Sequence, residues 1–290
     1  IAGHQWTVTQ GDIWVRTPSR QVRMNASGFS DCWIDRRGGL WDVSKKAHSA
    51  VSGWGAVPMI TVVQNAQNVV ALDSLGTCWG RGANLHHELD PYDRRGMYAG
   101  ASLFYMLHLP RRVVHVSLGD YHGCYVLCDG RMVCRGLDRG WGGWTDLRTT
   151  RTVELPGERI VESGATTDGT VVRCVSGRCF LFGYLPHVPH PGTHEPIRLP
   201  DLDGPVRRLV AGGSTVLAIT EKGDVRGIGR GFPVAWQKID VVHPVHDATI
   251  RKDHFAVTTL AHTHVGTLCD SCVMHRYTFR NPPACWSHTQ

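Results

Sequence analysis

Cysteine carries the clearest chemistry in this sequence, because ten cysteines are spread along 290 residues. Cys124 and Cys134 flank an Asp129-Gly130 turn, and a three-residue loop there places the two thiols opposite each other on neighbouring strands. Two thiols in that position can form a disulfide, which stabilises a hairpin by restricting the unfolded chain. The sequence therefore predicts a structural Cys124–Cys134 disulfide.

A second cysteine pair, Cys174 and Cys179, flanks Gly177. These thiols face each other only if the turn has two residues, because a three-residue loop places them on opposite faces of the hairpin. An even cysteine count with pairs across turns is typical of proteins from oxidising compartments. We therefore expect a secreted or surface-exposed protein, with buried free thiols inside the cell as the alternative.

Zinc binding is the other chemistry that the cysteines allow. Alternate residues of a strand point to one face, a Cys-x2-Cys turn presents two thiolates, and tetrahedral zinc takes four nitrogen or sulfur ligands. The residues in this pattern are His262, His264, Cys269 and Cys272. One Cys-x2-Cys is only half of a familiar zinc pair, so we expect no cofactor and keep zinc as the alternative to disulfides.

Catalytic signatures are absent from the sequence. It has no Gly-x-Ser-x-Gly, no phosphate-binding Gly-Lys-Ser/Thr loop and no His-Glu-x-x-His, so we predict a non-catalytic protein. The net charge is +6, but no run of Lys and Arg is longer than a pair, which disfavours nucleic acid as a partner. The longest apolar runs are interrupted by polar residues, so we expect no membrane span.

Two surface features are candidates for recognition and modification. Trp141 and Trp144 follow Arg135 and Arg139, and aromatic residues with arginine are typical of protein hot spots and glycan platforms. The alternative is that either Trp wedges between structural repeats. Asn25 begins an Asn-Ala-Ser triplet, which is an acceptor pattern for N-glycosylation.

Short strands separated by glycine turns must position these residues. An apolar strand, a small-residue turn and a second strand recur along the chain, and the turn glycines are Gly11, Gly38, Gly76, Gly130, Gly177, Gly223 and Gly266. Such recurrence predicts an all-β, single β-propeller domain over residues 1–290. Seven turns favour seven blades, and six is the alternative if Gly11 belongs to a strand that closes the ring. Residues 81–112 form an insertion, with a short helix expected over 97–109.

The repeated phrase resembles the regulator of chromosome condensation family of β-propellers. Residues 209–229 match its apolar-x-x-apolar-x-x-Gly and Ala-Leu-x-x-x-Gly-x-Val pattern best, and residues 116–136 and 69–82 also match. The family's usual Asn and Gly-Gln-Leu-Gly repeat ending is mostly missing. Residues 11–43, with their short spacing and tryptophans, look equally like the tectonin-type lectin propellers.

The resemblance implies a binding protein. The founding member's nucleotide exchange on a small GTPase uses acidic loops and a wedge, which have no counterpart that can be placed here. Other relatives are secreted binding proteins. We therefore expect a non-catalytic, secreted or surface-exposed propeller that recognises another macromolecule, most often a protein, through loops on one face. A tectonin-like glycan-binding lectin is the alternative, and an intracellular exchange factor is a further one.

Overall fold

In the computed structural model, most of the described residues lie in β-strands. The described residues are 5–9, 12–17, 20–25, 32–34, 37–42, 49–50, 57–90, 104–141, 148–189, 195–241, 244–251, 254–259, 262–268 and 273–280. Within them, no helix is long and apolar enough to cross a membrane.

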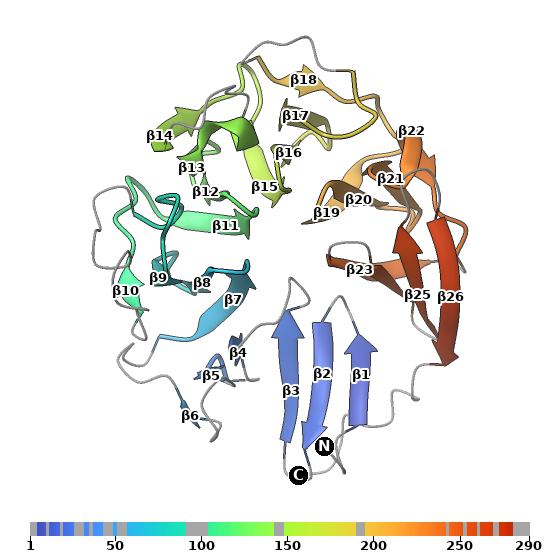
Figure 1. Cartoon of the computed structure of the whole chain (residues 1–290), viewed down its shortest axis with the longest axis horizontal. Helices are drawn as coiled ribbons and strands as arrows, with labels where there is room; N and C mark the ends of the chain where they lie inside the picture. Colours follow the sequence, from blue (N-terminus) through green and yellow to red (C-terminus); the bar gives the residue numbers. More distant parts are fainter. Residues whose placement is uncertain are drawn as a thin grey trace.

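The strands form six antiparallel sheets that stand around a central axis, so the chain is an all-β propeller (Figure 1). The first sheet has six strands, β1 (Gln5–Thr9), β2 (Asp12–Thr17), β3 (Arg20–Asn25), β4 (Cys32–Ile34), β5 (Leu40–Asp42) and β6 (Ser49–Ala50). Among the described residues, only the pair Arg23 and Ile34 joins its two halves, β1–β3 and β4–β6. The described strands therefore form six sheets, or seven units if these halves are counted separately.

Each of the other five sheets has four strands in up-and-down order, with the first strand nearest the axis (Figure 1). The second sheet has β7 (Met59–Gln64), β8 (Asn68–Asp73), β9 (Cys78–Gly82) and β10 (Tyr105–Met106). The third has β11 (Val113–Leu118), β12 (His122–Leu127), β13 (Met132–Leu137) and β14 (Arg148–Val153), and a 3-10 helix, η2 (Asp138–Trp141), follows β13.

The remaining three sheets repeat this arrangement. The fourth has β15 (Ile160–Ala165), β16 (Gly169–Cys174), β17 (Cys179–Gly183) and β18 (Ile197–Arg198). The fifth has β19 (Val206–Gly212), β20 (Thr215–Thr220), β21 (Val225–Gly229) and β22 (Phe232–Lys238). The sixth has β23 (Val245–Arg251), β24 (His254–Thr259), β25 (His262–Leu268) and β26 (Val273–Arg280).

The hydrophobic core consists of five clusters, each at the junction of two neighbouring sheets. In one of them Val126 and Met132 of the third sheet pack with Ile160 and Val172 of the fourth. The other clusters lie at the remaining junctions from the first sheet to the sixth. A single sheet buries only one face against a neighbour, so the ring as a whole is required to bury both faces.

Five predicted turn glycines adopt the left-handed backbone that the turn requires. The φ angles are +79° at Gly38, +85° at Gly76, +89° at Gly130, +80° at Gly177 and +84° at Gly223. The expected turn at Gly266 is wrong, because Gly266 lies inside β25 and pairs with β24 and β26. Gly11 lies outside the described residues.

The first strand of each four-stranded sheet carries a β-bulge near its start. The extra residue is Ile60, Val114, Val161, Arg207 or His246 in β7, β11, β15, β19 and β23, respectively. A bulge re-aims the side chain that follows it. The residues directly after the five bulges are Thr61, His115, Glu162, Arg208 and Asp247. The first strand of each four-stranded sheet therefore has a polar residue at the same position next to the axis.

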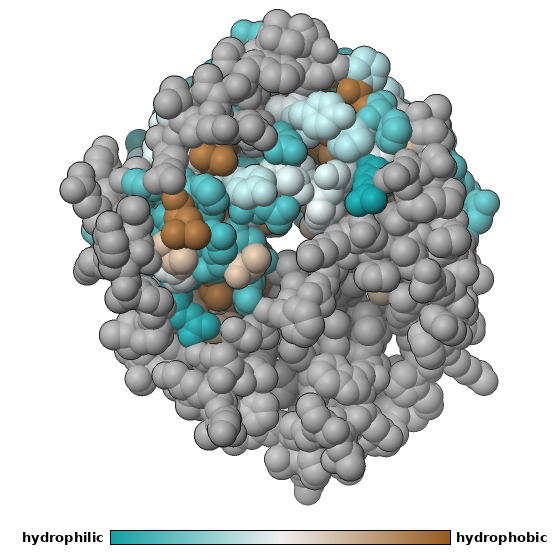
Figure 2. Space-filling model, viewed as in Figure 1, coloured by the Kyte–Doolittle hydropathy of each residue, from teal (hydrophilic) through white to brown (hydrophobic). Residues whose placement is uncertain are grey.

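The described part of the insertion contains no helix. Residues 104–109 were expected to end a helix, but Tyr105–Met106 form strand β10 and pair with β9. The face shown in Figure 2 has apolar side chains, in brown, over the second and third sheets, separated by hydrophilic side chains in teal. The coloured part of that face therefore has no continuous apolar patch.

Candidate functional site

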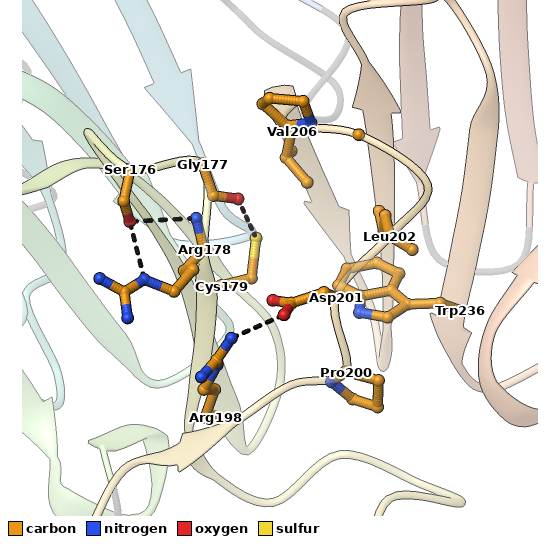
Figure 3. Close-up of a pocket in the computed structure, with 12 residues that line it drawn as sticks. Ser176, Gly177, Arg178, Cys179, Arg198, Pro200, Asp201, Leu202, Val206 and Trp236 are labelled. Atoms are coloured by element: carbon orange, nitrogen blue, oxygen red, sulfur yellow. Dashed lines mark hydrogen bonds and ion pairs between the residues drawn. The ribbon is translucent and has the colours of Figure 1, made fainter.

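A pocket of about 330 Å³ lies between the fourth and fifth sheets (Figure 3). One wall is the β16–β17 turn with the start of β17, and the opposite wall is the segment that leads from β18 into β19. Charged side chains and apolar ones share the lining, which includes Arg178, Arg198, Pro200, Asp201, Leu202 and Trp236. Mixed linings of this kind, with a few polar groups on apolar walls, are typical of ligand sites.

The charges at this pocket are paired within the protein. Arg198 donates to the Asp201 carboxylate at 2.6 Å, and the two side chains are 51% and 64% exposed. Arg178 forms an ion pair with the more buried Glu158, whose carboxylate also accepts the Ser176 hydroxyl at 2.8 Å. The Arg198 pair is therefore open to solvent, and an exposed pair of this kind contributes little stability.

Trp236, from β22, also lines the pocket and is only 4% exposed. Its indole Nε1 is buried and has no hydrogen-bond partner among the described residues, and its backbone φ of +54° is left-handed. In Figure 3 the nitrogen lies on the side of the ring nearest Asp201 and Pro200. The pocket lining thus contains a buried donor that no described residue satisfies.

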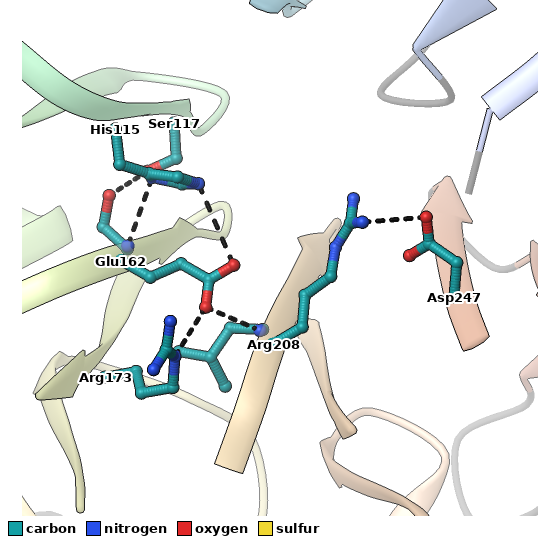
Figure 4. Close-up of polar contacts among 8 residues, drawn as sticks. His115, Ser117, Glu162, Arg173, Arg208 and Asp247 are labelled. Carbon is teal, nitrogen blue, oxygen red and sulfur yellow. Dashed lines mark hydrogen bonds and ion pairs between the residues drawn. The ribbon is translucent and has the colours of Figure 1, made fainter. Parts of the chain in front are cut away.

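The post-bulge residues around the axis form a chain of polar contacts between sheets (Figure 4). Glu162 lies in its middle, where it accepts Arg173 Nε at 2.8 Å and the Leu209 backbone N–H at 3.1 Å. His115 Nε2 lies 3.9 Å from the other Glu162 oxygen, and His115 Nδ1 accepts the Ser163 backbone N–H at 3.3 Å. This carboxylate therefore links the third, fourth and fifth sheets.

The same chain continues from the fifth sheet to the sixth. Arg208 Nη1 donates to Asp247 Oδ2 at 2.8 Å, and the other Asp247 oxygen accepts the Ala248 backbone N–H at 2.8 Å. Asp247 is 1% exposed, and this arginine compensates its buried charge. Burial lowers the pKa of His115, with Arg208 and Arg173 adding to the decrease and Glu162 opposing it.

Arg135 was predicted to be a surface binding residue, and this is wrong because its side chain is 5% exposed. Its guanidinium donates to the Leu89 carbonyl at 2.5 Å and also to the His108 carbonyl. These two carbonyls belong to the two ends of the insertion. Arg135 also lies 5.8 Å from the Tyr125 ring centre, so its role is to clamp the insertion onto the third sheet.

Further buried contacts fix the first limb of the insertion. The Asn84 side chain accepts the Leu89 backbone N–H at 2.9 Å and donates to the Asp90 carbonyl at 2.8 Å. The Tyr125 hydroxyl donates to the Glu88 carbonyl at 2.8 Å. Because these partners satisfy backbone groups of a loop, residues 84–90 are held in one conformation.

The outer surface of the insertion presents apolar and aromatic groups. Leu85 is 37% exposed, Met106 is 46% exposed and Tyr121, in the neighbouring β11–β12 turn, is 37% exposed. The His86 and Tyr121 rings meet edge to face, with centroids 5.2 Å apart. The His86–Tyr121 contact joins the insertion to this turn, and we call the surface they share the insertion face (Leu85, His86 and Tyr121).

The Arg139 and Trp141 candidates lie in η2, and Trp144 lies outside the described residues. The backbone of η2 packs against the fourth sheet. The Gly140 carbonyl accepts the Thr170 hydroxyl at 2.7 Å, and a Cβ on Gly140 would meet the buried His122 ring at 2.3 Å. This short helix therefore forms a contact between sheets, and the binding role of its side chains stays a prediction.

The register predicted for Cys124 and Cys134 is confirmed, because the two residues pair directly across β12 and β13. Their sulfurs lie 3.5 Å apart as free thiols. Burial raises the pKa of Cys134. Burial also acts to raise the pKa of Cys124, but hydrogen bonds with Cys134, His122 and Thr170 outweigh it and lower that pKa. The disulfide itself stays a prediction.

The two-residue turn that a Cys174–Cys179 disulfide requires is not present, so this pairing is wrong. Arg173 pairs with Cys179, so a three-residue loop separates the strands and the two cysteines point to opposite faces. Cys174 packs in the cluster between the third and fourth sheets, whereas Cys179 packs in the cluster between the fourth and fifth. Both are free thiols.

The metal and glycosylation candidates fall largely outside the described part of the chain. His262 and His264 lie in β25, and Cys269 and Cys272 are not among the described residues. Within the described ranges, no three His, Cys, Asp or Glu side chains are grouped to hold a metal ion. Asn25 ends β3, and the rest of its triplet is not described. Both predictions stay open.

Comparisons with known proteins agree with the fold. Residues 113–139, which form the third sheet up to η2, match the regulator of chromosome condensation (RCC1) repeat. The comparison with curated protein sequences finds no match.

Three solved propellers illustrate the structural similarity. Human WBSCR16 superposes with a TM-score of 0.67 at 16% identity, covering 95% of this chain and 81% of that one. Prp20p of Saccharomyces cerevisiae, described with binding properties to Gsp1p and histones, gives 0.66 at 10% identity, covering 97% and 77%. The CRINKLY WD40 ectodomain of the Arabidopsis thaliana receptor kinase ACR4 gives 0.54 at 10% identity, covering 94% and 97%. The chain thus has an RCC1-like propeller fold, and the comparisons give no support to the tectonin-like reading of residues 11–43.

Proposed function

We propose that this chain is a non-catalytic propeller that binds another protein through its insertion face. The observation that carries the proposal is the Arg135 clamp, which joins both ends of the insertion to the third sheet. A loop that is fixed before binding loses less conformational entropy when a partner docks. Loops held on a rigid scaffold are common sites of recognition.

The exposed groups of the insertion face suit a protein partner. Leu85 and Tyr121 offer apolar area, while His86 supplies a polar group beside the Tyr121 ring. Aromatic side chains are enriched in protein interfaces. Among the described residues, no comparable group favours glycan binding or nucleotide exchange on a GTPase.

We also propose that the protein acts outside the cell or on a surface. The support is the Cys124–Cys134 pair, whose direct pairing and 3.5 Å sulfur separation suit closure to a disulfide. Disulfides persist in oxidising compartments. Free thiols in the native protein, together with zinc bound near Cys269 and Cys272, would favour the intracellular alternative instead.

Affinity capture with a variant tests the binding proposal. The immobilised wild-type protein is compared with a Leu85→Ser, Tyr121→Ser double variant, using secreted and surface-protein fractions and quantitative mass spectrometry. The matched control is Val175→Ser, because Val175 is 64% exposed in the β16–β17 turn at the opposite ends of the strands. We expect the same proteins on the wild type and the control, and at least tenfold less on the double variant. Equal capture by all three would contradict the proposal.

A further inference from the structure

Trp236 combines two unfavourable features in one residue. Its φ of +54° lies in the left-handed region, where a residue with a bulky side chain is strained. Its indole nitrogen is a hydrogen-bond donor that is buried without a partner, which is also unfavourable. Trp236 packs in the core cluster between the fourth and fifth sheets, and two independent costs at a residue that also lines a pocket indicate a function in addition to packing.

The strand that carries Trp236 explains how the side chain reaches the pocket. Gly227 pairs with Gln237 and Gly229 pairs with Phe232, so β22 bulges between these two positions. Trp236 lies in this bulge, and its carbonyl accepts Arg226 Nη1 at 3.5 Å. Regular pairing between β21 and β22 stops in this stretch. The hydrogen bonds between these strands therefore do not impose the left-handed backbone of Trp236.

The pocket lining defines the chemistry of a ligand. The indole N–H needs an acceptor oxygen, and Arg198 at the rim is a cation whose own partner, Asp201, is 64% exposed. Pro200 and Leu202 supply apolar walls beside these polar groups. A carboxylate on a short aliphatic stem satisfies the donor, the cation and the walls together.

We propose that this pocket binds an acidic peptide segment of a partner protein, with one side-chain carboxylate accepting from Trp236 Nε1 and pairing with Arg198. Local charge complementarity supports this occupant, since Arg198 at the rim already pairs with a carboxylate, that of Asp201. The volume of about 330 Å³ suits one acidic side chain with its neighbouring backbone.

Binding requires an exchange of partners at the rim. The incoming carboxylate replaces Asp201 at Arg198. Because both side chains of this pair are exposed, breaking it costs little free energy. Trp236 Nε1 is shielded from water, so residues 200–204 of the outer wall must shift to admit the ligand. The hydrogen bond from Trp236 Nε1 to the bound carboxylate then forms away from water, where a hydrogen bond is strongest.

The pocket is separate from the insertion face, so the two proposals fail independently. The pocket uses the β16–β17 turn, whereas the insertion face uses the β11–β12 turn at the opposite ends of the strands. A partner that binds only the insertion face would leave the pocket test unaffected, and the reverse also holds.

The test is fluorescence polarisation with a bead-selected library of labelled hexapeptides that contain Glu, each paired with its Gln counterpart. We expect the wild type to prefer the best Glu peptide over the Gln form by about tenfold, as for a hydrogen bond to a charged group. Trp236→Phe keeps the apolar ring and removes the donor, so it should lose about tenfold in affinity. Arg198→Gln should lose a similar factor, and Asp201→Asn should gain affinity.

Two controls separate recognition from folding. Trp79→Phe removes an indole N–H that is already bonded to Asp73 at 3.1 Å, and it should leave peptide affinity unchanged. In the peptide-free protein, Trp236→Phe should keep or raise the melting temperature, because it removes an unsatisfied donor. Equal binding of Glu and Gln peptides, or unchanged affinity in Trp236→Phe, would overturn the proposal. Competition by free glutamate at the affinity of the peptide would also overturn it, in favour of a small-molecule site.

Discussion

Arg208 and Asp247 are bonded at 2.8 Å across the boundary between the fifth and sixth sheets, next to the axis of the propeller. Asp247 is almost completely buried, while Arg208 is partly open to solvent. We predict that Arg208→Met lowers the free energy of unfolding by about 1–2 kcal/mol, because it removes the cation bonded to a buried carboxylate; the partial exposure of Arg208 reduces the effect. Chemical denaturation measures it.

The control for this prediction is Arg198→Met. The Arg198–Asp201 pair is as short as the axial pair, but both of its side chains are more than half exposed. We expect no measurable change in stability for this variant. Equal loss in the two variants would show that the axial position of Arg208 has no special role.

Arg135→Lys tests the clamp on the insertion. Lysine keeps the charge, but it cannot present the planar fork that donates to Leu89 and His108 together. We predict a loss of about 2–4 kcal/mol in unfolding free energy, from buried carbonyls without their donors. Hydrogen exchange should rise at residues 84–90 and 104–109 before it rises elsewhere. Uniform acceleration across all sheets would contradict a local clamp.

Gly223→Ala tests the turns that define the repeat. At φ +84°, alanine is strained, and its Cβ would lie 2.8 Å from the Pro244 side chain. Gly157→Ala is the matched control, because Gly157 has φ +73° with nothing near the new Cβ. We predict that both variants are destabilised and that Gly223→Ala loses at least about 1 kcal/mol more, from overpacking. Thermal unfolding of the two variants distinguishes them.

His115 makes stability depend on pH. Its folded pKa is lowered by burial, so the unfolded chain binds a proton more readily than the folded chain does. Stability from this group is present above its unfolded pKa of about 6.5 and is lost as the pH falls toward the folded value. We predict that His115→Gln flattens this decline. The side chain is 32% exposed, so the effect is moderate, and an unchanged pH profile would exclude His115 as its source.

The Cys124–Cys134 pair should close on mild oxidation. The thiols face each other across neighbouring strands, and because both are fully buried, a disulfide-bearing oxidant reacts with one of them when the hairpin opens locally, after which the other thiol displaces the oxidant. We predict one intramolecular disulfide, seen by peptide mapping under non-reducing conditions, and none in Cys134→Ser. Closure between Cys174 and Cys179 instead would contradict the register.

The repeat pattern was sufficient to predict the architecture. Gly130 and Gly223 stand between apolar strands in the same way, and both adopt the left-handed backbone that a glycine turn uses. The pairing of Cys124 with Cys134 followed from the loop length at Gly130. The turn predicted at Gly266 was wrong because, in the sequence, a glycine inside a strand looks the same as a glycine in a turn. Only the strand pairing of Gly266 with Phe255 distinguishes the two.

The site was harder to predict because it depends on contacts between distant residues. Arg135 looked like a surface residue because its acceptors, at Leu89 and His108, belong to an insertion whose path the sequence does not reveal. Trp236 gave no signal, since the bulge in β22 breaks the strand pattern around it. Alignment of the first strands would have found the axial residues, because Glu162 and Arg208 occupy the same position in their repeats.

Site-specific photo-crosslinking tests the central claim, that the insertion face binds a protein, most directly. A benzophenone amino acid replaces Leu85 or Tyr121 on the insertion face, and Val175 in the β16–β17 turn serves as the control position. The account predicts crosslinks to the same partner protein from positions 85 and 121 and none from position 175. Crosslinks from position 175 alone, or from all three positions equally, would contradict it.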